Sequence, residues 1–411
     1  MAPWVTLHAW PSGETFPCCV ILPDKTSDSF MNGTGMTNLS ESNIADAWNS
    51  DVMKTLRINM MEDAPSSLCY RCIETEKTGA SWSLRNNLND KFAKKHWERI
   101  EATEFDGTHN DPKLLYWDIR FNNLCNMKCR SCSVSFSSQW YEDSVKGYGY
   151  DGKAYKGLPK QFWKDALPLI NDVEFAYFAG GEPLITEEHY DMLDVWINSG
   201  NTDLQIDYTT NFSKMSLGNK HVFDYWNKFT NVNVGASLDA SYARGEYMRK
   251  GTIWEDIVKN RKDMMRECPN TRFFLTPTIS MFNVLHFPDF HKEWLEEGLV
   301  DIYEINLNIL TEPTWLRIQH LPQEMKLAVE KRWENHIEWF TENHIKPKGD
   351  APMPDFIDKW HGVLNFMMAE NDKDDSDIIT FVHNTQWLDG LRKENWKNVF
   401  PELSMLKKYE Y

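Results

Sequence analysis

The sequence lacks long uninterrupted apolar runs. Among its 411 residues, no stretch reaches the roughly 18 consecutive apolar residues that a transmembrane helix requires. The first residues, Met-Ala-Pro-Trp-Val-Thr, do not show the basic region and apolar core of a secretion signal. We therefore predict a protein without a membrane segment, located in the cytoplasm.

Basic residues are also few relative to acidic ones. The chain has 44 Lys and Arg against 61 Asp and Glu, which gives a formal net charge of -17. An excess of negative charge opposes attraction to phosphate backbones, so nucleic acid is disfavoured as a partner. The spacing of the 8 Cys shows no pairing pattern typical of a secreted disulfide framework, and a reducing compartment is expected.

One group of cysteines points to chemistry. Cys125, Cys129 and Cys132 are spaced C-x3-C-x2-C and directly follow the strand-like run 114–121. Three thiolates on one loop do not close a four-ligand zinc site, but they can hold a cubane iron-sulfur cluster with one iron left open for a small ligand. Half of a zinc site is the alternative.

The spacing resembles that of the radical S-adenosylmethionine superfamily, in which the open iron is chelated by the amino and carboxylate groups of S-adenosylmethionine. A second match lies in 178–184, whose Gly-Gly-Glu-Pro is similar to the GGEP motif of that superfamily. The resemblance implies that Gly180, Gly181 and Glu182 line the amino end of S-adenosylmethionine. An ordinary strand-to-helix turn is the alternative.

Two further strand-like runs end in polar side chains. The run 204–211 ends in Asn211, and the run 232–239 ends in Ser237 and Asp239. Ligands bind at the carboxyl ends of parallel strands in α/β barrels. The resemblance assigns these three side chains to the ribose and carboxylate of the cofactor, whereas capping of the following helices is the alternative.

Two arginines are candidates near the cofactor. Arg249 would pair with the cofactor carboxylate through two parallel hydrogen bonds, unless it is a solvated arginine at a helix end. Arg130 follows the second cysteine, where members of the superfamily often have an aromatic residue. Its guanidinium plane could lie against adenine.

The pattern of the central region predicts an α/β fold. Helical stretches at 187–198, 253–267 and 287–296 alternate with strand-like runs, which lie at 114–121, 173–179, 204–210, 232–238, 273–280 and 301–309. This alternation implies a parallel sheet, and six strands resemble the partial (β/α)6 TIM-like barrel of the superfamily. Pro277 predicts a bulge or an exposed edge in the fifth run.

The N-terminal region forms a second cysteine-rich pattern. Residues 4–20 predict a hairpin with its turn at 11–13 and with Cys18 and Cys19 on the return strand, and 42–60 has helical spacing. Cys69 and Cys72 follow as C-x2-C. Together these features resemble the SPASM or Twitch domain, which holds an auxiliary 4Fe-4S cluster.

The auxiliary ligand set stays open at this point. The candidates are Cys18, Cys19, Cys69 and Cys72. If all four bind, the cluster is closed; if the adjacent pair supplies one ligand, an iron is left open for substrate. A closed zinc site is the alternative. The remaining Cys268 is expected to be a buried thiol.

These patterns predict three domains. Residues 1–105 form a small Cys-rich α+β auxiliary module, 106–310 the partial barrel, and 311–411 a helical C-terminal region with helices at 323–343 and 355–370. The acidic run 371–377 lacks the glycine and terminal glutamate of an EF-hand and is expected to be a solvated loop.

The resemblance implies a reaction. The enzyme would cleave S-adenosylmethionine reductively to a 5'-deoxyadenosyl radical, using one 4Fe-4S cluster and a reductant such as flavodoxin or ferredoxin, and abstract hydrogen from a peptide or protein substrate. A small carbohydrate or nucleotide substrate is an alternative, as is a non-catalytic metal-binding scaffold. No general base is identified, because the side to which Glu304 and Asn306 point is unknown.

Overall fold

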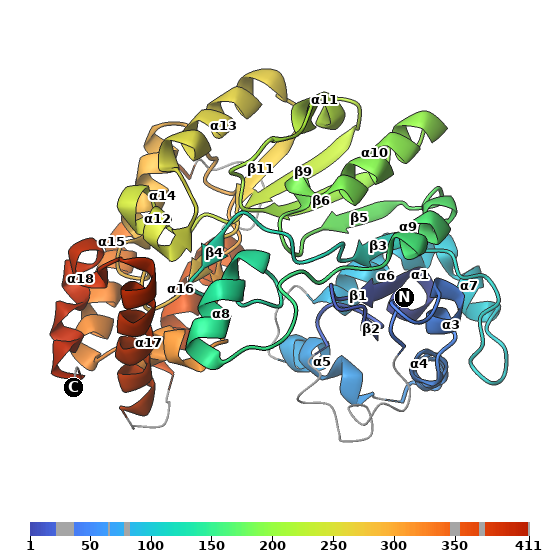
Figure 1. Ribbon diagram of the computed structural model, residues 1–411, viewed down its shortest axis with the longest axis horizontal. Coiled ribbons are helices and arrows are strands. Elements are labelled where there is room, and N and C mark those ends of the chain that lie inside the picture. The colour runs from blue at the N-terminus through green and yellow to red at the C-terminus, as the bar shows by residue number, and fades with distance from the viewer. Residues whose placement is uncertain (22–36, 65, 78–82, 346–353, 370–374, 410–411) are drawn as a thin grey trace. The chain divides into compact units, whose positions relative to one another are not determined.

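The computed structural model describes the chain except residues 22–36, 65, 78–82, 346–353, 370–374 and 410–411 (Figure 1). The described residues divide into two compact units. Unit 1 contains Met1–Leu124, Tyr155–Asp207 and Ser216–Val232, and unit 2 contains Cys125–Ala154, Tyr208–Met215 and Asn233–Tyr411.

The largest sheet has seven strands in the order β11-β9-β6-β5-β3-β1-β2 (Figure 1). Their bounds are Thr6–Ala9 (β1), Thr15–Phe16 (β2), Tyr116–Ile119 (β3), Phe175–Phe178 (β5), Gln205–Thr210 (β6), Asn231–Ala236 (β9) and Arg272–Leu275 (β11). Pairing is parallel between β1 and β3, between β3 and β5, and between β9 and β11. The predicted α/β class with a parallel sheet is confirmed.

The N-terminal hairpin is part of this sheet. Strand β1 pairs antiparallel with β2, as expected of a hairpin, and its other edge pairs with β3, with Thr6 opposite Tyr116. All four residues of β1 are buried, so both of its edges need hydrogen-bond partners. Cys18 and Cys19 lie in the turn beyond β2, not on the return strand as predicted.

The predicted helix 42–60 is two helices, α3 (Ile44–Trp48) and α4 (Asp51–Met61). The buried Arg57 side chain accounts for the break between them, because its guanidinium donates to the Trp48 carbonyl oxygen at 2.8 Å and to Asn49 Oδ1 at 3.0 Å. The other helices of unit 1 are α1 (Ala2–Val5), α5 (Tyr70–Lys77), α6 (Leu84–His96), α7 (Glu98–Glu101), α9 (Lys160–Ala166), α10 (Glu187–Ser199) and α11 (Val222–Trp226).

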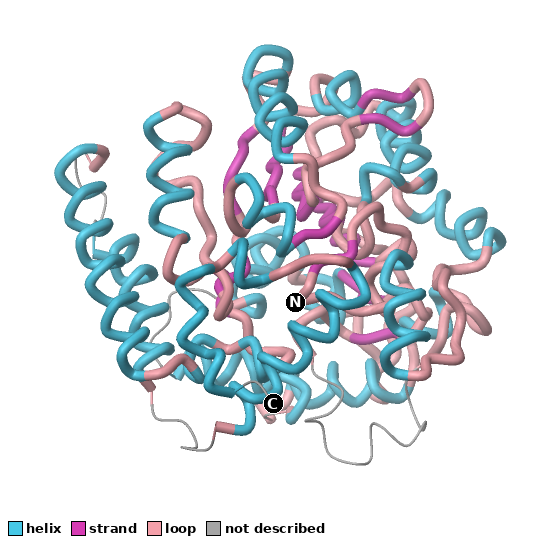
Figure 2. Tube along the Cα trace, turned by 60° about the vertical axis from the view of Figure 1, so that its left-hand side comes forward, coloured by secondary structure: helices cyan, strands magenta, loops and turns pink. Residues whose placement is uncertain are grey.

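Unit 2 is largely helical. Its helices are α8 (Tyr141–Tyr148), α12 (Tyr242–Met248), α13 (Trp254–Glu267), α14 (Phe287–Glu296), α15 (Gln323–Asn343), α16 (Pro354–Met368), α17 (Ser376–Arg392) and α18 (Trp396–Val399). The helices predicted in this unit match α13, α14, α15 and α16. The described residues after 310 contain helices and connecting turns but no strand. Helices are drawn in cyan in Figure 2. Residues 370–374, in the acidic run, fall outside the described residues.

The last predicted strands are shorter than expected. Pro277 separates β11 from β12 (Thr278–Ile279), which pairs in parallel with β13 (Asn308–Ile309). The break at Pro277 agrees with the predicted irregularity, because proline has no N–H to donate to the sheet. Of the predicted run 301–309, strand β13 covers only the end.

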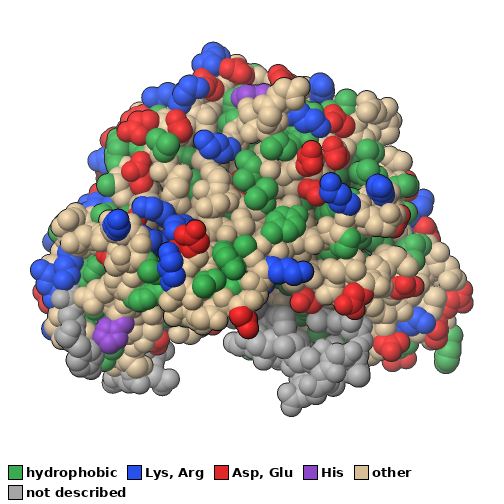
Figure 3. Space-filling view, viewed as in Figure 1, with side chains coloured by type: hydrophobic (Ala, Val, Ile, Leu, Met, Phe, Trp, Pro, Cys, Tyr) green, Lys and Arg blue, Asp and Glu red, His purple; other side chains and the backbone are tan. Residues whose placement is uncertain are grey.

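Side chains of both charges occur on the face of the molecule shown in Figure 3. No helix among the described residues is both long and apolar enough to cross a bilayer.

Two histidines are buried together between α14 and α15. His291 Nδ1 lies 2.9 Å from His336 Nε2, and both rings contact the aromatic side chains of Phe340 and Trp360. Burial lowers the pKa of His336 to about 4 and holds the pKa of His291 well below its ordinary value. The folded protein therefore holds this pair neutral.

We expect acid to destabilise this part of the fold. The pKa of His336 is 6.5 when exposed and about 4 when folded, so the unfolded chain binds more protons between these values. The free energy of unfolding should fall as the pH drops below 6.5, by at most about 3 kcal/mol from His336. Urea unfolding at several pH values measures the slope.

The matched variants are His336→Gln and His383→Gln, the second altering an exposed residue of α17. The first should reduce the pH dependence and the second should leave it unchanged. Equal pH dependence of the free energy of unfolding in both variants would contradict the assignment of this acid sensitivity to His336.

Candidate functional site

The cysteine triad of unit 2 lies on a tight loop beside a short strand pair. Strand β4 (Lys128–Cys129) pairs antiparallel with β10 (Arg249–Lys250), which places Arg249 opposite Cys129. The Cys132 backbone N–H donates to the Cys129 carbonyl at 3.1 Å. Cys125 is buried, whereas Cys129 and Cys132 are partly exposed. The loop therefore brings three thiols together next to Arg249.

Asn211, at the end of β6, contacts this loop. Its amide nitrogen donates to Asn126 Oδ1 at 2.9 Å and lies 3.9 Å from Cys125 Sγ. Its Oδ1 accepts from the Ser213 backbone N–H at 3.0 Å. Asn211 thus contacts the loop next to Cys125. It also stabilises the turn that follows β6 through the Ser213 N–H.

Arg249 and Asp239 form a buried ion pair at the second cysteine. Arg249 Nε and Nη2 lie 2.8 and 2.9 Å from the two Asp239 oxygens, and Arg249 Nη1 lies 3.8 Å from Cys129 Sγ. Asp239 also accepts from the Thr278 backbone N–H at 2.8 Å. Burial opposes the charge of Arg249, but Asp239 and Cys129 outweigh it and raise the pKa of Arg249. The two parallel hydrogen bonds of Arg249, which the sequence analysis expected to reach a cofactor carboxylate, therefore go to the Asp239 carboxylate.

Ser237 lies at the end of β9, and its hydroxyl is 3.4 Å from Thr276 Oγ1. Of the predicted residues in unit 2, Asn211 and Arg249 therefore touch cysteine sulfurs, Asp239 acts through Arg249, and Ser237 contacts a neighbouring threonine. Their assignments to the ribose and carboxylate of a cofactor stay predictions.

Arg130, which follows the second cysteine, lies in a buried ionic network with the C-terminal region. Its guanidinium carbon is 3.6 Å from the centre of the Tyr247 ring, and its Nη2 pairs with Asp389 and, at 2.8 Å, with Glu394. The guanidinium plane of Arg130 thus lies against the Tyr247 ring. The sequence had suggested that this plane could lie against the adenine of the cofactor. Asp389 also accepts from the Tyr247 hydroxyl at 2.8 Å.

The residue before Cys129 is held in a similar way. Lys128 Nζ lies 3.0 Å from Asp143 Oδ1, and Arg392 Nε lies 2.8 Å from Asp143 Oδ2. The sequence pattern indicated no site residue in the C-terminal region, where Asp389, Arg392 and Glu394 lie. Its carboxylates stand more than 250 positions from Arg130 in the sequence, so no local pattern could indicate the pairing.

The Gly-Gly-Glu segment belongs to unit 1 and follows β5. Gly180 has a φ of +125°, and a Cβ on Gly181 would lie 2.1 Å from the Leu124 carbonyl oxygen. The Glu182 backbone N–H donates to that oxygen at 2.7 Å, and its side chain accepts from the Leu184 N–H at 3.1 Å. The two glycines allow the turn to pack directly on the backbone that leads into the cysteine loop.

The four N-terminal cysteines gather in unit 1. Cys18, Cys19 and Cys69 are half-buried, and Cys72 is buried. Burial, together with the nearby Cys72 and Cys69, raises the pKa of Cys18 to about 12. Clustered thiols that resist ionisation need a bound cation to become thiolates, and thiolates are the donors of iron-sulfur clusters. The donor set therefore fits such a cluster.

The described residues include no group of three His, Cys, Asp or Glu side chains arranged around a single metal ion. A cubane places each thiolate on a different iron and does not require such an arrangement.

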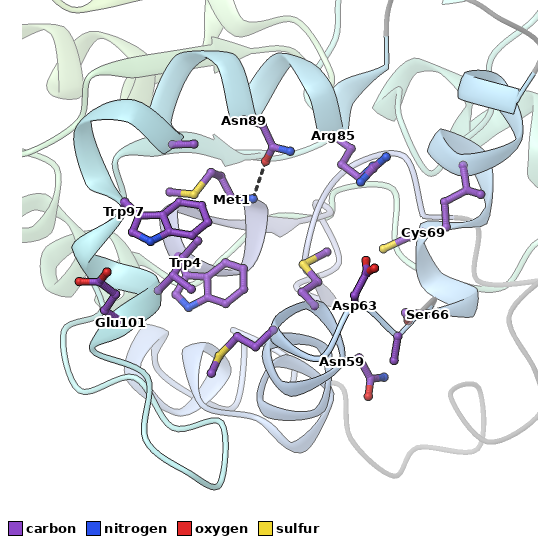
Figure 4. Close-up of a pocket in the computed structure, with 16 residues that line it drawn as sticks. Met1, Trp4, Asn59, Asp63, Ser66, Cys69, Arg85, Asn89, Trp97 and Glu101 are labelled. Carbon is purple, nitrogen blue, oxygen red and sulfur yellow. Dashed lines mark hydrogen bonds between the residues drawn. The ribbon is translucent and has the colours of Figure 1, made fainter.

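A cavity of about 720 Å³ lies beside these cysteines within unit 1 (Figure 4). Trp4 and Trp97 form apolar walls, and Arg85, Asp63 and Glu101 supply charge. Cys69 lines the cavity, so the first cysteine of the C-x2-C pair borders a space within the size range of ligand pockets.

Removal of the Arg249 guanidinium should destabilise the fold strongly. Arg249→Ala would leave the Asp239 carboxylate buried without its cation, which costs about 3–5 kcal/mol. Urea unfolding measures the loss. Arg272→Ala is the control, because Arg272 is 58% exposed where it pairs with Glu304, and a loss below about 1 kcal/mol is expected. Similar losses in both would contradict a structural role for the buried pair.

A methyl group at Gly181 should also be poorly tolerated. We expect Gly181→Ala to cost about 1–3 kcal/mol, because the Leu124 backbone must move. A Cβ at Gly390 of α17 would have no atom within 4 Å beyond those of its own helix. Gly390→Ala should therefore be neutral or stabilise the fold by roughly 0.4–1 kcal/mol. Thermal unfolding of the two variants compares them directly, and a tolerated Gly181→Ala would show that the backbone approach is not required.

Comparison with known proteins adds a family match in the N-terminal region. Residues 1–73 match the SPASM family, described as an iron-sulfur cluster-binding domain. No curated protein matches the chain.

Several solved structures are similar at low identity. Native anSMEcpe with bound AdoMet and Cp18Cys peptide is 14% identical over 53% of this chain and 57% of that chain, with a TM-score of 0.37. Streptococcus suis SuiB bound to S-adenosylmethionine is 13% identical over 84% of this chain and 74% of that chain, with a TM-score of 0.40. TYW1 with a lysine-pyruvate adduct bound is 14% identical over 58% of this chain and 75% of that chain, with a TM-score of 0.30. The matched part is thus little more than half of the anSMEcpe chain.

The match over residues 1–73 agrees with the N-terminal cysteine pattern, so this part of the chain is similar to the SPASM iron-sulfur cluster-binding domain. The C-x3-C-x2-C loop follows β3 of the seven-stranded sheet.

Proposed function

We propose that this chain is an enzyme that uses S-adenosylmethionine to generate a radical and abstracts hydrogen from a peptide or protein. The observation that carries the proposal is the loop of Cys125, Cys129 and Cys132 with Asn211 at the first thiol and Arg249 at the second. When bound, a reduced 4Fe-4S cluster supplies one electron that breaks the C5'–S bond of S-adenosylmethionine, giving methionine and a 5'-deoxyadenosyl radical. The protein supplies the ligands and the geometry.

The residues around the loop have separate tasks. The three cysteines would hold the cluster. Arg249 carries a positive charge 3.8 Å from Cys129 Sγ, which favours the thiolate form that a cluster requires. Asp239 keeps Arg249 oriented through two hydrogen bonds. Asn211 fixes the backbone beside Cys125 through Asn126, so the first ligand stays in place before metal arrives.

The Gly-Gly-Glu turn would contribute to the binding of S-adenosylmethionine. Two residues without a Cβ let the backbone approach a ligand, and the buried Glu182 carboxylate suits the ammonium end of the cofactor. This assignment rests on the resemblance of the motif to GGEP.

A peptide substrate is supported by the N-terminal domain. By resemblance, auxiliary modules of this type occur in enzymes that modify peptides or proteins. The 720 Å³ cavity beside Cys69 combines apolar walls with Arg85, Asp63 and Glu101, which suits a segment of peptide with a large side chain. A reductant such as flavodoxin or ferredoxin would supply the electron.

The first experiment is anaerobic reconstitution of the full chain, followed by reduction with dithionite in the presence of S-adenosylmethionine. We expect about eight irons per chain, with matching sulfide, and formation of 5'-deoxyadenosine. Cys125→Ala should reduce 5'-deoxyadenosine to background. The matched control is Cys268→Ala, which removes a buried thiol outside the three cysteine groups and should keep the activity.

Zinc in place of iron, or reconstituted clusters that never cleave S-adenosylmethionine, would refute the proposal and favour a metal-binding scaffold. The substrate class has a separate test. A digest of deuterated protein should transfer deuterium to 5'-deoxyadenosine, and deuterated glucose or nucleosides should not. The reverse result would favour a carbohydrate or nucleotide substrate.

A further inference from the structure

The adjacent cysteines Cys18 and Cys19 have different surroundings in unit 1. Cys18 lines a small cavity, and the same cavity is lined by Cys69 and Cys72. Its walls are otherwise mostly apolar and include Leu56, Leu68, Leu84 and Leu88. Among the described residues, Cys19 does not line this cavity. Three thiols from two separate segments therefore face one space.

Apolar packing fixes the direction of Cys18. It packs against a buried cluster formed by Phe16, Ile21, Val52 and Leu68. Leu68 directly precedes Cys69 in the short turn that starts α5, so the same apolar cluster holds both cysteine segments. The position of Cys18 relative to the C-x2-C pair is thus set by the core and not by a surface loop.

Cys19 faces a buried polar group instead. The Asp118 carboxylate on β3 is a charged neighbour of its thiol. That carboxylate also lies 3.2 Å from His8 Nδ1 and 3.0 Å from Arg120 Nη2, and all three residues of this group are at least nine-tenths buried. Cys19 therefore has a buried ionic group beside it, whereas Cys18 lines the cavity that Cys69 and Cys72 also line.

From this arrangement we infer that Cys18, Cys69 and Cys72 are ligands of the auxiliary iron-sulfur cluster, and that Cys19, which lies beside Asp118, is not a ligand. The inference rests on the SPASM match of residues 1–73 and on the three-cysteine cavity, and it is independent of the substrate. It also selects between the two ligand sets that the cysteine spacing leaves open.

The test counts iron at the auxiliary site alone. Cys125→Ala, Cys129→Ala and Cys132→Ala are combined in the full chain, so that the remaining iron belongs to the N-terminal cysteines. Cys18→Ala and Cys19→Ala are then added one at a time, and each protein is reconstituted anaerobically. Iron and sulfide are counted, and the reduced cluster is measured by electron paramagnetic resonance.

We expect the Cys18→Ala protein to lose the auxiliary iron and its resonance signal, and the Cys19→Ala protein to keep both. Loss only in Cys19→Ala, loss in both, or loss in neither would overturn the inference. Circular dichroism and urea unfolding of the unreconstituted proteins show whether each is folded, and Cys18→Ser and Cys19→Ser repeat the comparison with side chains closer in size to cysteine. Because S-adenosylmethionine is absent from this count, failure here is distinguishable from failure of the proposed reaction.

Discussion

The charged residues on either side of Cys129 constrain unit 2. Lys128 and Arg130 place positive charge next to the loop that carries the cysteine triad, and Arg130 is buried. A buried cation without a partner is strongly unfavourable, so the fold must bring carboxylates to it. Asp143 comes from α8, whereas Asp389 and Glu394 come from the C-terminal end of the chain. The C-terminal helices therefore hold the cysteine loop in place.

The same principle explains the ion pair between Asp239 and Arg249 beside Cys129. Asp239 and Arg249 neutralise each other, and Arg249 also lies 3.8 Å from Cys129 Sγ. The site consequently has its charges organised before a cluster binds. Asn211 adds a neutral contact at Cys125, so each of these two cysteines has a neighbour from a different strand end.

Much of the fold follows from local pattern, whereas the pairing of distant residues does not. The helix at 323–343 has the bounds predicted from its apolar spacing, and Gly181 stands where a close backbone approach requires glycine. The partners of Arg130 and the pairing of β1 with β3 depend on residues more than 100 positions away, for which one sequence contains no signal. The break between α3 and α4 depends on Arg57, whose role appears only when its carbonyl partners are known.

The pairing of β1 with β3 has a consequence for synthesis of the protein. His8 and Asp118, opposite each other in these strands, are 110 residues apart in the chain. At ribosomal rates of addition, β1 is synthesised roughly 5–20 seconds before its partner exists. Until then one edge of a strand that is fully buried in the folded protein stays exposed, and such edges invite intermolecular pairing. The nascent chain thus has a window in which a chaperone would be most useful, and the N-terminal segment completes its folding only after the first strand of the central region has been made.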